Sequence, residues 1–465
     1  MGSIRRSIMK MTSSGKYNMY IFALLVLCAP VRMQAQVITT VANIELGCGY
    51  SGDGSAAIYA KFDEPKGIAI DKFGSLYIAD PANNRVRMID AYGIVRTFAG
   101  NGKGGYSGDG GKATSAELNR PYYVAIDAEG NVYISDTYNC RVRKVNASGI
   151  ISTVAGNGVL GSSGNNGPAI KAELTYPYGL CFDAAGNLYI ADGLWVKKVN
   201  TEGIISNVVG SGQTDYGGDG GPATSASCGS NVAVACDNKG NLYVADGRFN
   251  CIRKVDANGI ITKFAGAKIT NVNDTASGDG GQAIDARIFS PSDLKFDSYG
   301  NLFVVDEGDG RIRKIDSAGI ITTLAGDGSA KHSGDGNPAN KAGVFLPYGM
   351  VIDENENIYF TETSQYSNEQ SNDIRVVFGI EFSNTSSEVV VYPNPSFDGV
   401  VRLLFASKYT ENVLIVITNM AGQKVYENTF PTNLPIEVHL EPTGIYALSG
   451  RAKHTKWHSE ISIVR

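Results

Sequence analysis

The sequence contains six copies of one unit, and this repetition restricts the fold more than any other feature. Six aspartates each end a short apolar run, at spacings of 56, 56, 54, 60 and 56 residues: Asp71, Asp127, Asp183, Asp237, Asp297 and Asp353. Nine residues after each lies a second column of acids: Asp80, Asp136, Asp192, Asp246, Asp306 and Glu362. A third column lies eighteen residues before the first, four times within Ser-Gly-Asp-Gly: Asp53, Asp109, Asn165, Asp219, Asp279 and Asp335.

Each unit contains four strand-like runs separated by tight turns. In unit two we expect strands at Val124–Asp127, Val132–Ser135, Arg141–Val145 and Ile150–Ala155, because these runs alternate and are rich in Val, Ile, Tyr and Thr. Gly makes up 56 of the 465 residues, as many tight turns require, and no helical pattern of useful length interrupts the units. Four antiparallel strands repeated six times predict an all-β protein, a six-bladed β-propeller.

The repeated motifs also resemble a known family. Pro-x-Gly-Ile-Ala-x-Asp, Gly-x-Leu-Tyr-Ile-Ala-Asp and Asn-x-Arg-Val-Arg are similar to the NHL repeat over residues 37–379, and this resemblance implies a β-propeller. Unit six ends at residues 374–378 without a fourth strand, whereas residues 37–42 form a strand-like run with no unit of their own. We therefore expect a propeller at residues 36–379 whose sixth blade is closed by the N-terminal strand, which removes an exposed sheet edge.

The N-terminus has the pattern of a secretory signal peptide. Basic residues precede an apolar run at residues 19–31, which is too short to span a bilayer, and a small residue, Ala35, precedes a plausible cleavage point. We predict a signal peptide at residues 1–35; lipidation at Cys28 and an uncleaved anchor are the alternatives. No other long apolar run exists, so we expect no transmembrane segment in the mature chain.

A separate module follows the propeller. Residues 380–390 have the composition of a linker, and alternating runs in residues 391–465 predict a small β-sandwich. Residues 388–465, with Tyr392-Pro-Asn-Pro395 and Gly444-Ile-Tyr446, resemble the type A C-terminal sorting domain of the type IX secretion system. The resemblance implies recognition by that machinery as a partner, and a secreted or cell-surface protein of a Gram-negative bacterium. An ordinary accessory sandwich is the alternative.

Charge and histidine content exclude several classes of function. The net charge of −5 argues against nucleic-acid binding, which needs a basic surface. His332 is the one histidine in the propeller range, where we expect it to be a loop residue, so a zinc site of several histidines in the channel is excluded. The mature chain has six cysteines, and Cys228 and Cys236 fall in columns that are otherwise apolar. A disulfide framework is therefore not expected, although one disulfide stays open.

Acidic turns are the candidates for metal binding. Each Ser-Gly-Asp-Gly turn offers one carboxylate, whereas calcium needs six to eight oxygens, so an Asx turn that caps the loop competes with calcium. Asp306, Glu307 and Asp309 place three acids in one turn and form the best single metal candidate. No cofactor is required by the sequence, and calcium is the ion that these turns could hold.

Strand direction predicts which face carries a ligand. The long loops and the turns between the second and third strands share one face, so the residue after the Pro that opens each blade should line the channel mouth there. These residues are Lys66, Tyr122, Tyr178, Ser292 and Tyr348, with Val232 in unit four. The adjacent turns add Tyr138, Trp195 and Phe249. Such an aromatic rim suits sugars or peptides, and packing of tyrosines between blades is the equal alternative.

Three functions fit these features. The first is a secreted, non-catalytic propeller scaffold that binds an extracellular protein, peptide or carbohydrate on the face carrying the Ser-Gly-Asp-Gly loops. The second is a lyase or hydrolase that uses acids of this face and a bound metal, and the third is a purely structural surface protein. The scarcity of histidine and the absence of paired acids outside Asp306–Asp309 favour binding.

Overall fold

The computed structural model describes residues 36–44, 47–267, 278–364 and 371–378, together with the strands between residues 389 and 463. The expected signal peptide, residues 1–35, lies outside the described residues. Within the described part of the chain, no helix is both long enough and apolar enough to cross a membrane.

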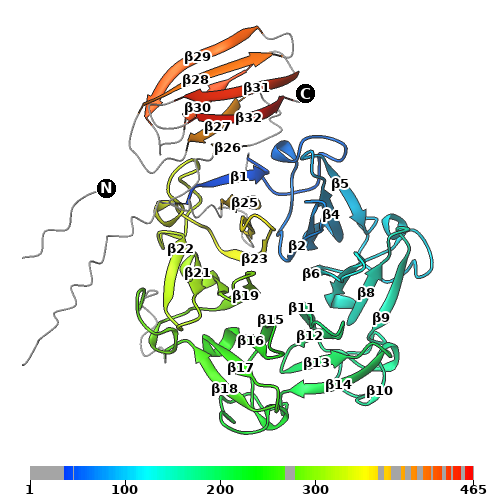
Figure 1. The fold of residues 1–465 in the computed structure, drawn as a ribbon. Helices are drawn as coiled ribbons and strands as arrows, with labels where there is room; N and C mark the ends of the chain where they lie inside the picture. The colour runs from blue at the N-terminus through cyan, green and yellow to red at the C-terminus, as the bar shows by residue number, and fades with distance from the viewer. Residues whose placement is uncertain are drawn as a thin grey trace, which may run out of the picture. The chain divides into compact units, whose positions relative to one another are not determined.

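Six antiparallel sheets surround a common centre, as Figure 1 shows. Their innermost strands contact one another in a closed ring: β2 (Ile68–Ile70), β6 (Pro121–Ile126), β11 (Pro177–Phe182), β15 (Asn231–Cys236), β19 (Pro291–Phe296), β23 (Pro347–Ile352) and again β2. The six-bladed propeller expected from the six units is therefore present.

Each blade continues outward from its innermost strand in chain order. The second and third strands are β3 (Leu76–Asp80) and β4 (Arg85–Ile89), β7 (Val132–Asp136) and β8 (Arg141–Val145), β12 (Leu188–Asp192) and β13 (Trp195–Val199), β16 (Leu242–Asp246) and β17 (Cys251–Val255), β20 (Leu302–Asp306) and β21 (Arg311–Ile315), and β24 (Ile358–Glu362) and β25 (Ile374–Val377). The outer strands of the first five blades are β5 (Val95–Ala99), β9 (Ile151–Ala155), β14 (Ile204–Val209), β18 (Ile261–Ala265) and β22 (Ile321–Ala325); β10 (Gly167–Pro168) also pairs with β14.

The boundaries of the expected strands of unit two agree with those of β6–β9 to within one residue, except that β6 begins three residues earlier, at Pro121. Short 3-10 turns, which the strand pattern did not predict, precede the innermost strands and follow four of the second strands. They are η1 (Ala57–Tyr59), η2 (Pro81–Asn83), η3 (Ala113–Ser115), η4 (Thr137–Asn139), η5 (Ala169–Lys171), η6 (Ala223–Ser225), η7 (Gly247–Phe249), η8 (Ala283–Asp285), η9 (Glu307–Asp309) and η10 (Ala339–Lys341).

The N-terminal strand closes blade six, as the missing fourth strand predicted. Strand β1 (Ile38–Ala42) pairs antiparallel with β25, with Ile38 opposite Val377. Ile38 is fully buried, and the backbone N–H of Thr40 donates a 2.9 Å hydrogen bond to Asp335 of the blade-six loop. The ring is thus held shut by pairing between the two ends of the propeller.

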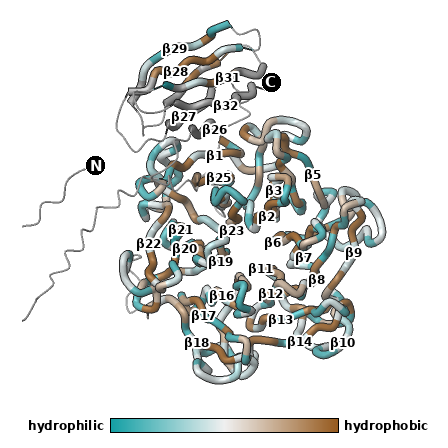
Figure 2. Tube along the Cα trace, in the orientation of Figure 1, coloured by the Kyte–Doolittle hydropathy of each residue, from teal (hydrophilic) through white to brown (hydrophobic). Residues whose placement is uncertain are grey.

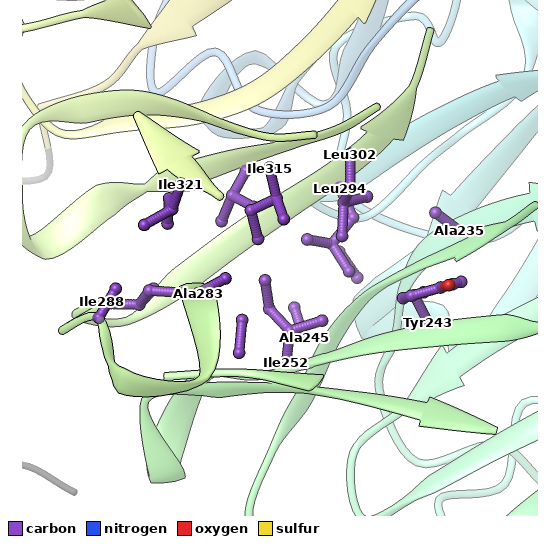
Figure 3. Close-up of a cluster of buried hydrophobic side chains, with 14 residues drawn as sticks. Ala235, Tyr243, Ala245, Ile252, Ala283, Ile288, Leu294, Leu302, Ile315 and Ile321 are labelled. Atoms are coloured by element: carbon purple, nitrogen blue, oxygen red, sulfur yellow. The ribbon is translucent and has the colours of Figure 1, made fainter. Parts of the chain in front are cut away.

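The core lies between neighbouring blades. Figure 3 shows one such cluster, in which Tyr243, Ala245 and Ile252 of blade four meet Leu294 and Leu302 of blade five. Hydrophobic residues concentrate in the strands and hydrophilic ones in the loops (Figure 2). Each sheet therefore buries both faces against its neighbours, which is why the strands carry apolar residues on both sides.

A buried arginine joins two of the repeated acids in a blade. In blade two, Arg143 is fully buried; its Nη2 lies 2.6 Å from Asp109 and its Nη1 lies 3.2 Å from Asp136. In blades one, four, five and six the corresponding arginine also pairs with the loop aspartate: Arg87, Arg253, Arg313 and Arg375. Blade three has Lys197 and Asn165 at these two positions. The loop aspartates were expected to cap their own loops as Asx turns, and this was wrong because each carboxylate neutralises a buried guanidinium.

The acids at the ends of the second strands hold the neighbouring loops. Asp136 accepts hydrogen bonds from Asn139 of the following turn at 2.8 Å and from the backbone N–H of Asn119 at 2.7 Å. Burial raises the pKa of Asp136 to about 6 even though these donors and Arg143 lower it. The Asx turns occur instead in the column of Asp71, whose Oδ1 accepts N–H groups of Phe73 and Ser75.

The C-terminal module forms two sheets in its described residues. One has the order β26 (Val389–Tyr392), β27 (Val400–Phe405), β30 (Ile436–His439), and the other β29 (Lys424–Pro431), β28 (Asn412–Asn419), β31 (Gly444–Arg451), β32 (Lys456–Ile463). β26 contacts β32, as in the small sandwich expected. β26 begins two residues inside the range expected for the linker, because its valines pair with β27.

Candidate ligand-binding face

The column after the opening Pro converges at one end of the channel. Lys66 is 1% exposed, and its Nζ lies 3.8 Å from the ring centre of Tyr348 and 5.1 Å from that of Tyr122. Tyr122 in turn contacts Tyr178 edge-to-face at 5.4 Å, and Ser292 donates a 2.9 Å hydrogen bond to the backbone oxygen of Tyr348. The predicted ring of residues is therefore assembled, although Lys66, Ser292 and Tyr348 are buried in it.

Charges surround the Lys66 ammonium. Burial lowers the pKa of Lys66 to about 8, and only the carboxylates of Glu307 and Glu64 oppose that effect. Glu307 lies in η9 of blade five, whereas Lys66 belongs to blade one. Burial raises the pKa of Glu307, and the charge of Lys66 opposes that effect. A buried ammonium and a partly buried carboxylate thus interact electrostatically in this part of the ring.

The exposed part of the ring is a tyrosine cluster on blades two and three. Tyr138 stacks on Tyr122 at 6.2 Å and contacts Tyr176 at 6.1 Å, and Tyr178 completes the set. Tyr138 and Tyr176 are 50% and 41% exposed. We call Tyr122, Tyr138, Tyr176 and Tyr178 the tyrosine cluster. Its exposed rings offer flat apolar faces with phenolic donors at their edges, which suit sugars and peptides.

Two residues expected at the rim have other contacts than the tyrosine cluster. Trp195 pairs with Asp192 at the start of β13, because the turn of blade three is two residues shorter, and it packs beside Gly212 of the outer loop. Phe249 contacts Tyr216 at 5.4 Å and lies beside Gly229. Neither has a ring contact with the tyrosine cluster among the described residues.

One column at the rim was missed. The residue directly before the opening Pro also points to this face: Tyr176 belongs to it, and so do Glu64 and Arg120, which form an ion pair between blades one and two. Arg120 Cζ also lies 5.9 Å from the ring centre of Tyr138. The sequence could have predicted this column, because Glu64, Arg120 and Tyr176 occupy the same position relative to the opening Pro in their units.

The three acids of the blade-five turn do not share one task. Asp306 accepts the backbone N–H of Phe289 at 2.7 Å and faces Arg313, whereas the pKa of Glu307 is influenced by the charge of Lys66. Asp309 has a buried Oδ2 without a hydrogen-bond partner. Within the described residues, the carboxylate oxygens of these three acids do not come close enough together to form a set of metal ligands. Metal binding by them stays a prediction.

The histidine of the propeller is more than a loop residue. His332 Nδ1 lies 2.9 Å from Glu362 and 2.8 Å from Asp373, and both acids are fully buried. Burial alone would lower the pKa of His332, but these two carboxylates raise it to about 10. Sequence spacing gave no signal for this cluster, because it uses positions where unit six departs from the repeat.

Two family models match the chain. That for the teneurin NHL domain matches residues 43–104, 102–164, 160–216 and 264–331. The chain belongs to the NHL-repeat family. A model for the secretion system C-terminal sorting domain matches residues 390–464. The NHL-repeat protein therefore carries a type IX sorting domain, which indicates export to the cell surface or secretion.

Relatives and solved structures share the propeller. Teneurin-1 of Mus musculus is 30% identical over 275 residues, which are 52% of this chain and 10% of teneurin-1, so the chain spans about a tenth of that relative. A chloroplast protein of Arabidopsis thaliana, SUPPRESSOR OF QUENCHING 1, is 28% identical over 63% of this chain and 30% of its own. A Bacteroides thetaiotaomicron protein of unknown function has a TM-score of 0.55 at 18% identity, over 74% of this chain and 76% of that one, which shows the fold alone.

Proposed function

We propose that this NHL-repeat protein is an exported, non-catalytic binding propeller. It takes an extracellular protein, peptide or carbohydrate ligand on the face that carries the Ser-Gly-Asp-Gly loops. The observation that supports this proposal most directly is the tyrosine cluster, in which two mutually contacting rings, Tyr138 and Tyr176, are half exposed beside the Glu64–Arg120 ion pair. Aromatic faces next to a charged pair provide stacking and directional hydrogen bonds together.

The surroundings of the cluster support binding rather than chemistry. Tyr122 contacts both Tyr178 and the buried Lys66, so the exposed rings pack on a fixed support. Rings that are fixed before binding lose little conformational entropy when a ligand stacks on them. Proteins described as auxiliary nutrient binding proteins share the fold; one from Bacteroides ovatus has a TM-score of 0.52 at 14% identity, over 75% of this chain and 78% of that one.

An array of glycans and peptides, probed with the purified full chain, tests this function. We expect a ligand that binds the wild type and loses affinity when Tyr138 and Tyr176 are replaced by Ala. The array is repeated with calcium and with a chelator, because calcium in the acidic turns would change affinity. Turnover of an arrayed ligand, seen as a new product by mass spectrometry, would instead support the lyase or hydrolase alternative.

A further inference from the structure

Blade six contains a convergent set of metal-ligand atoms away from the tyrosine cluster. His332 comes from the loop before η10, Glu362 from the end of β24, and Asp373 from the residue before β25. One ligand atom of each lies within 4.8 Å of the others. Three separate segments of the chain therefore meet at one point.

The cluster exists because blade six differs from the other blades. In blades one to five the acid at the end of the second strand is an aspartate that accepts a backbone N–H from the preceding loop, as Asp136 does from Asn119. Glu362 is one methylene longer and bonds instead to Arg375 at 3.0 Å, Ser371 at 2.8 Å and His332 at 2.9 Å. Its carboxylate thereby takes part in a side-chain cluster.

One nitrogen faces two carboxylate oxygens. His332 Nδ1 can carry a single hydrogen, yet Glu362 Oε2 and Asp373 Oδ2 lie 2.9 and 2.8 Å from it. Asp373 is fully buried, and its Oδ2 has no hydrogen-bond partner when the Nδ1 hydrogen points to Glu362. Two buried carboxylate oxygens that share one hydrogen are incompletely satisfied, and a cation that binds both would satisfy them better.

The charges leave room for a cation. Three acids, Asp335, Glu362 and Asp373, gather around one arginine, Arg375, and one histidine, His332. Arg375 binds Asp335 and Glu362, so it does not reach the carboxylate oxygen of Asp373 that faces His332. A cation between His332, Glu362 and Asp373 would face two buried carboxylates, and charges interact more strongly away from water.

We propose that His332, Glu362 and Asp373 form a binding site for a divalent first-row transition ion, zinc above all. One imidazole nitrogen with two carboxylates matches zinc, whereas calcium and magnesium prefer oxygen ligands alone. Tetrahedral ligands about 2.0–2.1 Å from zinc lie about 3.3 Å apart, so the side chains need to separate by only about half an ångström.

The site would tie the Ser-Gly-Asp-Gly loop of blade six to β24 and β25. It lies in the blade that closes the ring, because β25 pairs with β1. His332 is 17% exposed while both acids are fully buried, so solvent reaches the cluster from the histidine side and water can complete the coordination. The proposal does not depend on the tyrosine cluster binding a ligand.

Metal titration of the full chain tests the site. We expect the wild type, stripped with a chelator and dialysed against zinc, to hold one more zinc ion per chain than His332→Gln and Asp373→Asn. Asp136→Asn is the matched control, because Asp136 ends the second strand of blade two without a histidine beside it; it should hold as much zinc as the wild type. Zinc should also raise the melting temperature of the wild type and the control, but not of the two variants.

Cobalt distinguishes this site from the cysteines and from the histidines of the C-terminal module. We expect the cobalt-substituted wild type to show visible absorption bands but no thiolate charge-transfer band. The visible bands should be lost in His332→Gln. Equal zinc content in the wild type and both variants overturns the proposal. If both variants fail to fold, zinc-edge absorption of the wild type decides: one nitrogen ligand among oxygens supports the site, and sulfur or several imidazoles overturn it.

Discussion

Tyr123 of blade two donates a 2.6 Å hydrogen bond to Asp293 Oδ1 of blade five, and both side chains are buried. Asp293 also pairs with Lys295 at 2.8 Å and accepts the backbone N–H of Met350 of blade six, again at 2.8 Å. The corresponding position holds Gly67, Gly179, Ala233 and Gly349 in the other blades, and a Cβ on Gly67 would lie 2.7 Å from the ring of Tyr123. Asp293 thus links blades two, five and six across the channel. The link fits because the other blades have glycine or alanine at this position and leave space for the two side chains.

This link predicts coupling between distant blades. Asp293→Asn and Tyr123→Phe should each lower the free energy of unfolding by about 1.5–3 kcal/mol, since Tyr123→Phe removes the hydroxyl that donates to a buried charged group and Asp293→Asn removes that charge. The double variant should lose less than the sum of the two, with a coupling of at least about 1 kcal/mol. Denaturant unfolding of the four proteins measures it, and strict additivity would show that the two side chains do not interact in solution.

The buried arginines predict large effects of small changes. Arg143→Ala should cost about 3–5 kcal/mol, because Asp136 then remains buried without its partner. The double variant Arg143→Lys with Asp109→Asn copies Lys197 and Asn165 of blade three and should cost clearly less. Thermal and denaturant unfolding compare the two. An equal cost would mean that the shape of arginine, rather than the charge, is what blade two requires.

Closure by the N-terminal strand has a matched control within the chain. Ile38 lies opposite Val377 in blade six, just as Ile151 lies opposite Val145 in blade two, and both isoleucines are fully buried. Ile38→Ala and Ile151→Ala should therefore each lower the free energy of unfolding by about 2–5 kcal/mol. If only Ile151→Ala destabilises the protein, β1 is not docked in solution.

Repetition explains what the sequence could predict. The strand positions recur in all six units and the opening Pro in five of them, so the same column can be compared between units. Ring closure followed because unit six alone departs from the pattern by lacking its fourth strand. The pairing of the loop aspartates with arginine was also readable, because blade three replaces both members at once, as Asn165 and Lys197. Tyr123–Asp293 and the cluster at His332 could not be found this way. They join positions that differ between units, and only the folded ring brings them together.

Lys66 predicts a pH dependence of stability. The folded-state pKa of about 8 lies below the ordinary lysine pKa of 10.5, so the unfolded chain binds more protons between these pH values. Stability should therefore rise with pH from about 8 to 10.5, relative to Lys66→Met, by up to about 3 kcal/mol. Unfolding of wild type and variant at several pH values gives the difference. The exposed Lys72→Met is the control and should show no such trend.

The tyrosines separate binding from packing. Tyr138 and Tyr176 are about half exposed, whereas Tyr348 is buried beneath Lys66. Replacing Tyr138 and Tyr176 with Ala should weaken ligand binding at least tenfold, because each stacked ring contributes about 0.5–1.5 kcal/mol beyond burial and one decade of affinity is 1.4 kcal/mol. The melting temperature should change little.

Tyr348→Ala should do the reverse and lower stability by about 3–5 kcal/mol, as large-to-small core changes do. Affinity by calorimetry and unfolding by heat are measured on the same variants. Unchanged affinity in the exposed pair, for a ligand that binds the wild type, would leave blade packing as the role of these rings and place the ligand on another surface.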